Sequence, residues 1–204
     1  MRLVLGLGNE GPEYRWTRHN AGFMVADRLA SRAGVEFQAR GDLGRLAWTA
    51  EIDLGGDDRV VLAKPRTLMN LSGRAAAALQ RKYALALESL IVVHDDADLA
   101  LGRVRVRPEG GTGGHNGLRS LVEVLGAGTF PRVKLGVLGE GRHGSDLADY
   151  VLERFHPDER GVVEGMVERG AAAVESVVRD GVVAAQRAWN GPDAEERPPR
   201  SGAP

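Results

Sequence analysis

The chain has 204 residues, of which 43% are hydrophobic and 27% charged, and it carries a formal net charge of -1 and no cysteine. This length and composition predict one globular domain with a sizeable core, and the absence of cysteine excludes disulfides and thiolate metal sites. The sequence shows neither a secretory leader nor an apolar run long enough to span a bilayer, so we expect a soluble, cytoplasmic protein without membrane attachment.

Strand-like apolar runs alternate with helical patterns along the chain. Strands are expected at residues 3–7, 46–54, 60–63, 90–93, 104–106 and 133–138, and helices at 20–33, 72–85, 116–125 and about 157–189. Asn20 and Ser72 are expected to cap the first two helices. The alternation predicts a single α/β domain over residues 1–190, with a parallel or mixed sheet and helices against it. The tail 191–204 lacks apolar residues to bury and is predicted to be disordered.

The first expected strand runs into “GLGNEG” at residues 6–11, which has the G-x-G-x-x-G spacing of a dinucleotide-binding turn. That site needs a helix to begin at the glycines, because the free N–H groups of the first turn hold the pyrophosphate. Here Pro12 follows the third glycine, and the next helical pattern begins only near Asn20. We therefore expect the glycines to shape a turn that presents Asn9 and His19, and a dinucleotide-dependent oxidoreductase stays as an alternative.

Polar clusters follow expected strands or precede expected helices. They are “NEGPEYRWTRHN” with His19, “KPRTLMNLSG” with Asn70, “HDDAD” with Asp95, and “GGTGGHNG” with His115 and Asn116. Ligands of open α/β sheets bind outside the carboxyl ends of the strands, so we expect these clusters to converge. Histidines, amides and carboxylates together suit the hydrolysis of an activated carbonyl, which needs a base, a group that orients it and oxyanion donors.

Motifs that the chain lacks narrow this chemistry. Without a cysteine or a G-x-S-x-G elbow, a covalent acyl-enzyme has no obvious nucleophile, and the histidines do not have the spacing of a zinc site. A water that is activated directly by a neutral imidazole, itself held by a carboxylate, remains. The aspartates of “HDDAD” leave open a Mg²⁺-dependent phosphohydrolase.

The chain resembles the bacterial-type peptidyl-tRNA hydrolases in segments that occur in the same order: “GLGNEGPEYRWTRHNAGF”, “KPRTLMNLSG”, “HDDADLALGRVRVRPEGGTGGHNGLRS”, “FPRVKLGVLG” and “DYVLERF”. The resemblance covers about residues 1 to 190. It implies a single α/β domain with a mixed, twisted sheet flanked by helices, which acts as a monomer without metal, cofactor or obligate protein partner. The implied reaction is hydrolysis of the ester between a peptide and the 3′ ribose of tRNA, with peptidyl-tRNA as the substrate.

The resemblance also assigns roles by motif. His19 in “TRHN” is implied as the base that activates water, and Asp95 as the residue that orients and polarises it. The implied substrate-binding residues are Asn9, Tyr14, Met69, Asn70, His115 and Asn116. The amides of Asn70 and Asn116 would also steady the oxyanion. Arg107 and Lys134 match the basic residues that clamp a tRNA phosphate in this family.

Alternating arginines in “RVRVR” predict a basic strand face that contains Arg103, Arg105 and Arg107. That face is expected to be extended by Arg119, Arg132 and Lys134. A locally basic surface on a nearly neutral protein suits phosphate binding. A non-catalytic RNA-binding relative would keep this surface and lack turnover.

The chain departs from the family pattern in a few places. Glu10 replaces the usual proline of “GNPG”, which adds a charge and removes a fixed φ beside Asn9. Lys134 stands where arginine is common, so a point charge replaces a bidentate fork. The glycines of residues 139–146 predict a mobile gate over the peptide channel.

Overall fold

The computed structural model describes residues 1–54, 59–139 and 146–191. The expected gate at 139–146 and the expected disordered tail therefore lie almost wholly outside the described residues. Within the described ranges, no helix combines the length and the apolarity that crossing a membrane requires.

A six-stranded mixed sheet forms the centre of the described fold, in the order β2-β3-β1-β4-β6-β5. Its strands are β1 (Arg2–Gly6), β2 (Ala47–Asp53), β3 (Arg59–Pro65), β4 (Leu90–Ala100), β5 (Val104–Arg107) and β6 (Arg132–Leu138). The inner strands β3, β1, β4 and β6 run parallel, and β2 and β5 add antiparallel edges. The predicted α/β fold with a mixed sheet is confirmed.

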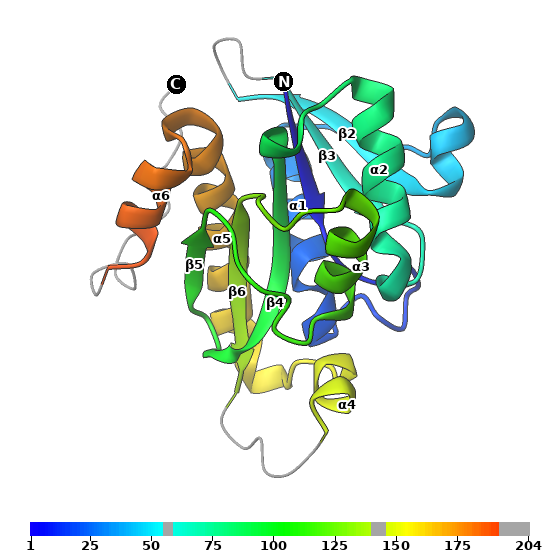
Figure 1. Cartoon of the computed structure of the whole chain (residues 1–204). Coiled ribbons are helices and arrows are strands. Elements are labelled where there is room, and N and C mark those ends of the chain that lie inside the picture. The colour runs from blue at the N-terminus through cyan, green and yellow to red at the C-terminus, as the bar shows by residue number, and fades with distance from the viewer. Residues whose placement is uncertain (55–58, 140–145, 192–204) are drawn as a thin grey trace.

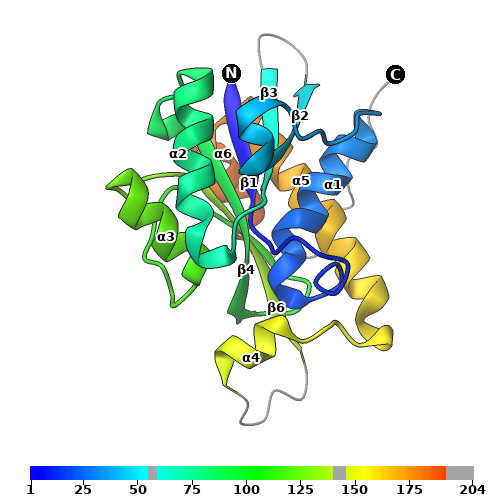
Figure 2. The same cartoon turned by 90° about the vertical axis from the view of Figure 1, so that its right-hand side faces the viewer.

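Helices cover both faces of this sheet (Figures 1 and 2). On one face lie α1 (Ala21–Arg32) and α5 (Arg160–Asp180), and on the other α2 (Ser72–Tyr83) and α3 (Asn116–Leu125). Alternate residues of the inner strands supply the two cores: Val4 and Ile91 face α1 and α5, whereas Leu3 and Leu90 face α2 and α3. Both faces are apolar because parallel strands with helices on each side are fully buried. The short helix α4 (Leu147–Leu152) lies across the end of the sheet where β4 and β6 terminate.

The long helix expected at about 157–189 is wrong as one element. A 3₁₀ turn over Pro157–Glu159 precedes α5, and Gly181 then breaks the chain with a φ of 79°, a left-handed value that favours glycine. The following helix α6 (Val182–Trp189) turns back to the edge of the sheet. There the Asn190 side chain accepts from the N–H and donates to the C=O of Val106, both at 2.9 Å, as a neighbouring strand would. Because the chain turns at Gly181, α6 and Asn190 cover the exposed edge of β5.

The glycines of the first turn allow α1 to pack closely against the end of β1. A Cβ on Gly8 would lie 2.6 Å from the Phe23 ring, and one on Gly6 would overlap the backbone of Gly22. No helix begins at these glycines, since α1 starts only at Ala21. The described structure thus lacks the helix N-terminus that a pyrophosphate would need at this turn, and it does not favour the dinucleotide alternative.

Gly22 is a position where one methyl group is expected to be costly. A Cβ there would overlap the carbonyl oxygens of Leu7 and Val93, because α1 crosses β1 and β4 at backbone contact. We expect Gly22→Ala to lower the free energy of unfolding by about 1–3 kcal/mol, the cost of overpacking a core. Urea denaturation measures this, with Gly161→Ala in α5 as the control, since a Cβ at Gly161 meets no atom within 4 Å. Equal midpoints for the two variants would refute the tight crossing.

Candidate active site

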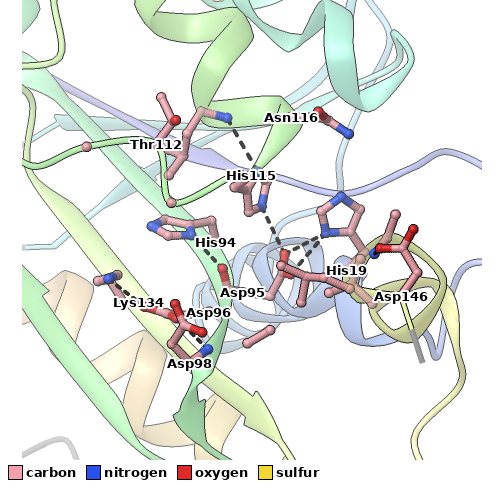
Figure 3. A pocket seen from close by; sticks show the side chains of 18 residues that line it. His19, His94, Asp95, Asp96, Asp98, Thr112, His115, Asn116, Lys134 and Asp146 are labelled. Atoms are coloured by element: carbon pink, nitrogen blue, oxygen red, sulfur yellow. Dashed lines mark hydrogen bonds and ion pairs between the residues drawn. The ribbon is translucent and has the colours of Figure 1, made fainter. Parts of the chain in front are cut away.

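The imidazole of His19 and the carboxylate of Asp95 meet at the carboxyl end of the sheet (Figure 3). His19 lies on a 3₁₀ turn, Arg18–Asn20, directly before α1, and its Nδ1 is 2.9 and 3.0 Å from the two oxygens of Asp95. Both side chains are buried. Asp95 does not follow its strand as predicted, because β4 continues to Ala100 and contains the whole “HDDAD” run. The structure therefore brings together the two residues that the resemblance names as the base and its orienter.

His115 approaches the same carboxylate from the opposite face of the sheet. It occupies the N-cap of α3, where its Nδ1 accepts from the N–H groups of Gly117 and Leu118 at 3.1 and 3.4 Å. An Nδ1 that accepts leaves the proton on Nε2, which is 3.0 Å from Oδ1 of Asp95 and donates to it. The rings of His19 and His115 lie 4.7 Å apart between centroids. Asp95 is thus flanked by two imidazoles.

Burial alone would raise the pKa of Asp95, but its electrostatic attraction to the His19 and His115 rings and the hydrogen bonds from them outweigh burial and hold the pKa well below its ordinary value. Asp95 is therefore an anion at neutral pH and accepts hydrogen bonds only. It follows that His19 donates its Nδ1–H to Asp95 and keeps the lone pair of Nε2 available. A general base needs this tautomer.

His94 is a buried neighbour that the sequence did not single out as a site residue. Its Nδ1–H donates to the carbonyl oxygen of Asp95 at 2.6 Å, and its ring meets that of His115 edge to face, with centroids 5.2 Å apart. Burial, followed by repulsion from His115, lowers the pKa of His94 to about 3. His94 is therefore a neutral group at physiological pH and holds the backbone of Asp95 in place.

Asn20 holds the loop that carries Asn9. Its side-chain oxygen accepts from the Asn9 N–H at 2.8 Å, and its amide nitrogen donates to the Asn9 carbonyl at 3.0 Å. Asn20 occupies the N-cap position of α1, as predicted, but its side chain makes no cap hydrogen bond there. Ser72 likewise does not cap α2 but is its first residue. Asn20 is a positioning residue that sequence reasoning missed, since a capping residue and a clamp look alike in a sequence.

Two cavities meet at His19. One, of about 350 Å³, is lined by Asp95, His94, His115, Lys134 and the glycine loop before α3. The other, of about 500 Å³, is lined by Asn9, Met69 and Asn70 and by apolar residues of α4. His19 and Asn116 line both cavities, so a substrate that spans them passes the imidazole.

The amides of Asn70 and Asn116 point to a role in binding. Within the described part of the chain, neither side chain makes a hydrogen bond, although both line the cavity beside His19. Tyr14, by contrast, lies in the turn before His19 and lines neither of the two cavities. The structure thus gathers all the expected substrate-binding residues except Tyr14 around the His19–Asp95 pair.

The ring nitrogens of His19 and His115 that face Asp95 could ligate a cation only by losing their protons. One ligand atom each from His19, Asp95 and His115 lies within 4.8 Å of the others. However, both ring N–H groups already face the Asp95 carboxylate, so a metal would have to displace them. Asp96, which a Mg²⁺ site in “HDDAD” would need, is paired with Lys134.

The predicted basic face is only partly correct. Arg105 and Arg107 lie exposed on β5, and Arg105 is directly opposite Lys134 of β6. Arg132, which was expected to extend the face, is 2% exposed. Its guanidinium donates to the carbonyl oxygens of Gly110 and Gly111 and lies over the ring of Phe130. Arg132 therefore anchors the glycine loop before α3 and is not exposed to a phosphate.

Comparison with known proteins identifies the family. The family model described as peptidyl-tRNA hydrolase matches residues 3–197 of the chain. A peptidyl-tRNA hydrolase from Desulforudis audaxviator is 46% identical over 190 residues, which cover 93% of each chain. One from Geotalea daltonii is 43% identical over 196 residues, or 95% of this chain and 98% of the relative. The crystal structure of peptidyl-tRNA hydrolase from Acinetobacter baumannii matches with a TM-score of 0.81 at 30% identity, covering 94% of this chain and 95% of that one.

The chain therefore belongs to the peptidyl-tRNA hydrolase family. The family resemblance that the sequence motifs indicated is confirmed over nearly the whole chain. This membership decides against the oxidoreductase and the Mg²⁺-dependent phosphohydrolase alternatives, and a measurement of turnover tests the non-catalytic RNA-binding alternative.

Proposed function

We propose that this chain hydrolyses the ester bond between a peptide and the 3′ ribose of tRNA, by means of a water that His19 activates. The observation that carries this mechanism is the buried His19–Asp95 pair, with Nδ1–Oδ1 at 2.9 Å, at the junction of two cavities. In this proposal the released tRNA and peptide are recycled from stalled translation, and the activity is expected in the cytoplasm. The chain acts as a monomer and without a metal in this proposal.

Each proton has a defined place in the reaction. Nε2 of His19 takes a proton from the attacking water while the water oxygen bonds to the ester carbonyl carbon. Asp95 stabilises the imidazolium that results, as a carboxylate on the far ring nitrogen does in other hydrolases. The tetrahedral intermediate then collapses, the bond to the ribose oxygen breaks, and that oxygen takes the proton from His19. The amides of Asn70 and Asn116 stabilise the negative charge on the former carbonyl oxygen.

The 500 Å³ cavity suits the peptide. Its rim carries large apolar side chains that are exposed, with Leu68 at 69% and Leu152 at 45%, and Met69 lies against its wall. Exposed apolar residues that gather at a concave site commonly mark a binding surface. The side chains that α4 contributes to this cavity are apolar, and α3 adds Arg119 and Glu123, so the groove offers a peptide both apolar and charged contacts.

Arg107 is proposed to bind a tRNA phosphate, because it is exposed on β5 and has no ion pair among the described residues. We expect Arg107→Ala to weaken the binding of deacylated tRNA and to reduce the slope of log K against log salt by about 0.7–0.9, the value for one lost phosphate contact. Binding titrations over a range of salt concentrations measure this, with Arg81→Ala on α2 as a control of equal charge. A slope equal to that of the wild type would show that Arg107 is only a solvated residue.

The His19–Asp95 pair is tested by Asp95→Asn. The amide keeps the shape of the carboxylate but cannot stabilise an imidazolium, so kcat is expected to fall by about 10²- to 10⁴-fold and the pH–rate profile to change. The matched control is Asp98→Asn, which removes the same charge from an exposed position on β4. An unchanged kcat and an unchanged pH–rate profile in Asp95→Asn would overturn the proposed mechanism.

A further inference from the structure

Asp96 and Lys134 form an ion pair beside the catalytic carboxylate. Nζ of Lys134 on β6 lies 2.5 Å from Oδ2 of Asp96, the residue that follows Asp95 on β4 (Figure 3). The other oxygen of Asp96 accepts the N–H of Asp98 at 2.9 Å, so both oxygens of the carboxylate are engaged. The Lys134 and Asp96 side chains are 31% and 13% exposed. The pair is therefore partly sheltered from solvent and is screened less than a surface pair.

Asp96 is charged at neutral pH. Burial alone would raise its pKa, but the hydrogen bond from Lys134 and that from the Asp98 N–H outweigh burial and lower it. The two side chains together are thus electrically neutral. Arg105, opposite Lys134 on the neighbouring strand, has no ion pair among the described residues, and neither has Arg107. In the described part of the chain, no ion pair balances the charges of Arg105 and Arg107, whereas the charge of Lys134 is already balanced by Asp96.

We infer that Asp96 masks Lys134 by neutralising its charge, so that the arginines of β5 supply the affinity of this face for tRNA. Asp96 thereby limits how tightly tRNA is held. This inference rests on the proposed function, because it assumes that the face binds a tRNA phosphate.

The physical reason lies in the source of phosphate affinity. A cation that neutralises a phosphate releases condensed counterions, whereas a neutral ion pair releases few. A phosphate near Lys134 also competes with, and is repelled by, the carboxylate 2.5 Å away. Since substrate and product carry the same tRNA body, tighter phosphate binding would hold both equally and would not favour the transition state. A masked lysine thus limits the retention of the product.

The inference is tested by Asp96→Asn, in which the amide oxygen can still accept the Asp98 N–H and preserve the local turn. The control is Asp98→Asn, which changes the net charge equally two residues along β4. We expect Asp96→Asn to bind deacylated tRNA about two- to fivefold more tightly than Asp98→Asn, as for the loss of one partly exposed ion pair. Its slope of log K against log salt should be steeper by about 0.7–0.9, because one more phosphate contact becomes effective.

Lys134→Ala completes the test. In the Asp96→Asn background, where the change leaves no carboxylate unpaired, it should abolish the gain in affinity and slope. Two results would overturn the inference. In the first, Asp96→Asn binds no more tightly than Asp98→Asn while Arg107→Ala binds more weakly than the wild type. The inference that Asp96 neutralises Lys134 is then wrong, but Arg107 still binds a phosphate. If Arg107→Ala and Asp96→Asn both bind as the wild type does, the phosphate site itself is wrong, and the mask with it.

Discussion

Replacing His19 by alanine is expected to reduce kcat for ester cleavage by about 10²- to 10⁴-fold or more, because the reaction loses the general base that takes the proton from water. Neither of the two imidazoles described beside it, those of His94 and His115, can take its place. His94 is buried and neutral with its Nδ1–H committed to Asp95, and His115 uses both ring nitrogens, one as a helix cap and one as a donor to Asp95. Binding of deacylated tRNA should survive, because the basic face on β5 does not include His19.

The measurement is single-turnover cleavage alongside a tRNA-binding titration, with His156→Ala as the control. His156 is an exposed histidine before α5 that lines neither of the two cavities at the pair. Turnover at the wild-type rate by His19→Ala would remove His19 from the mechanism. Equal losses of binding and of turnover would show instead that the variant had lost its fold.

The second large effect concerns stability in acid. His94 has a pKa of about 3 in the folded chain, whereas the ordinary value is 6.5, so the unfolded chain binds a proton that the folded chain does not between these two values. Stability therefore rises with pH across this window, and it is lost as the pH falls from about 6.5 towards 3. The loss from one buried histidine is on the order of a few kcal/mol, since each pKa unit corresponds to about 1.4 kcal/mol. Asp95, whose pKa is also lowered, adds a loss in the same direction at the acid end.

His94→Asn tests this expectation. The Asn amide can still donate to the Asp95 carbonyl, as Nδ1–H of His94 does, but it does not take up a proton in acid. We expect urea midpoints measured between pH 7 and pH 4 to fall less steeply for His94→Asn than for the wild type. His156→Asn, at an exposed position, should keep the wild-type steepness. Parallel curves for His94→Asn and the wild type would refute the account of His94.

The sequence was sufficient to predict the fold class and most of the strands, because alternation between apolar strands and amphipathic helices is a local signal. It could not predict that β4 continues through “HDDAD”, since a run of carboxylates reads as a loop until a neighbouring strand pairs with it. Nor could it predict the break at Gly181, where the reason for the turn is the distant edge of β5.

The sequence motifs identified most of the site residues. Contacts between residues far apart in the chain are seen only in the structure. Asn20, His94 and Arg132 are each held in place by partners remote in the chain or by burial, neither of which composition reveals. A guanidinium buried against glycine carbonyls and one exposed to phosphate have the same sequence signal. Arg132 is buried and Arg107 is exposed, a difference that depends on the packing of the fold and not on the local sequence.

The most direct test of the central claim uses an N-acetylated aminoacyl-tRNA as substrate, incubated with the wild-type chain in EDTA. The proposed site predicts rapid release of the N-acetylamino acid and of intact tRNA, with no requirement for a divalent metal and no cleavage in a parallel incubation with His19→Ala. The absence of release by the wild-type chain, or a release that appears only when a metal is restored, would contradict hydrolysis by a water that His19 activates.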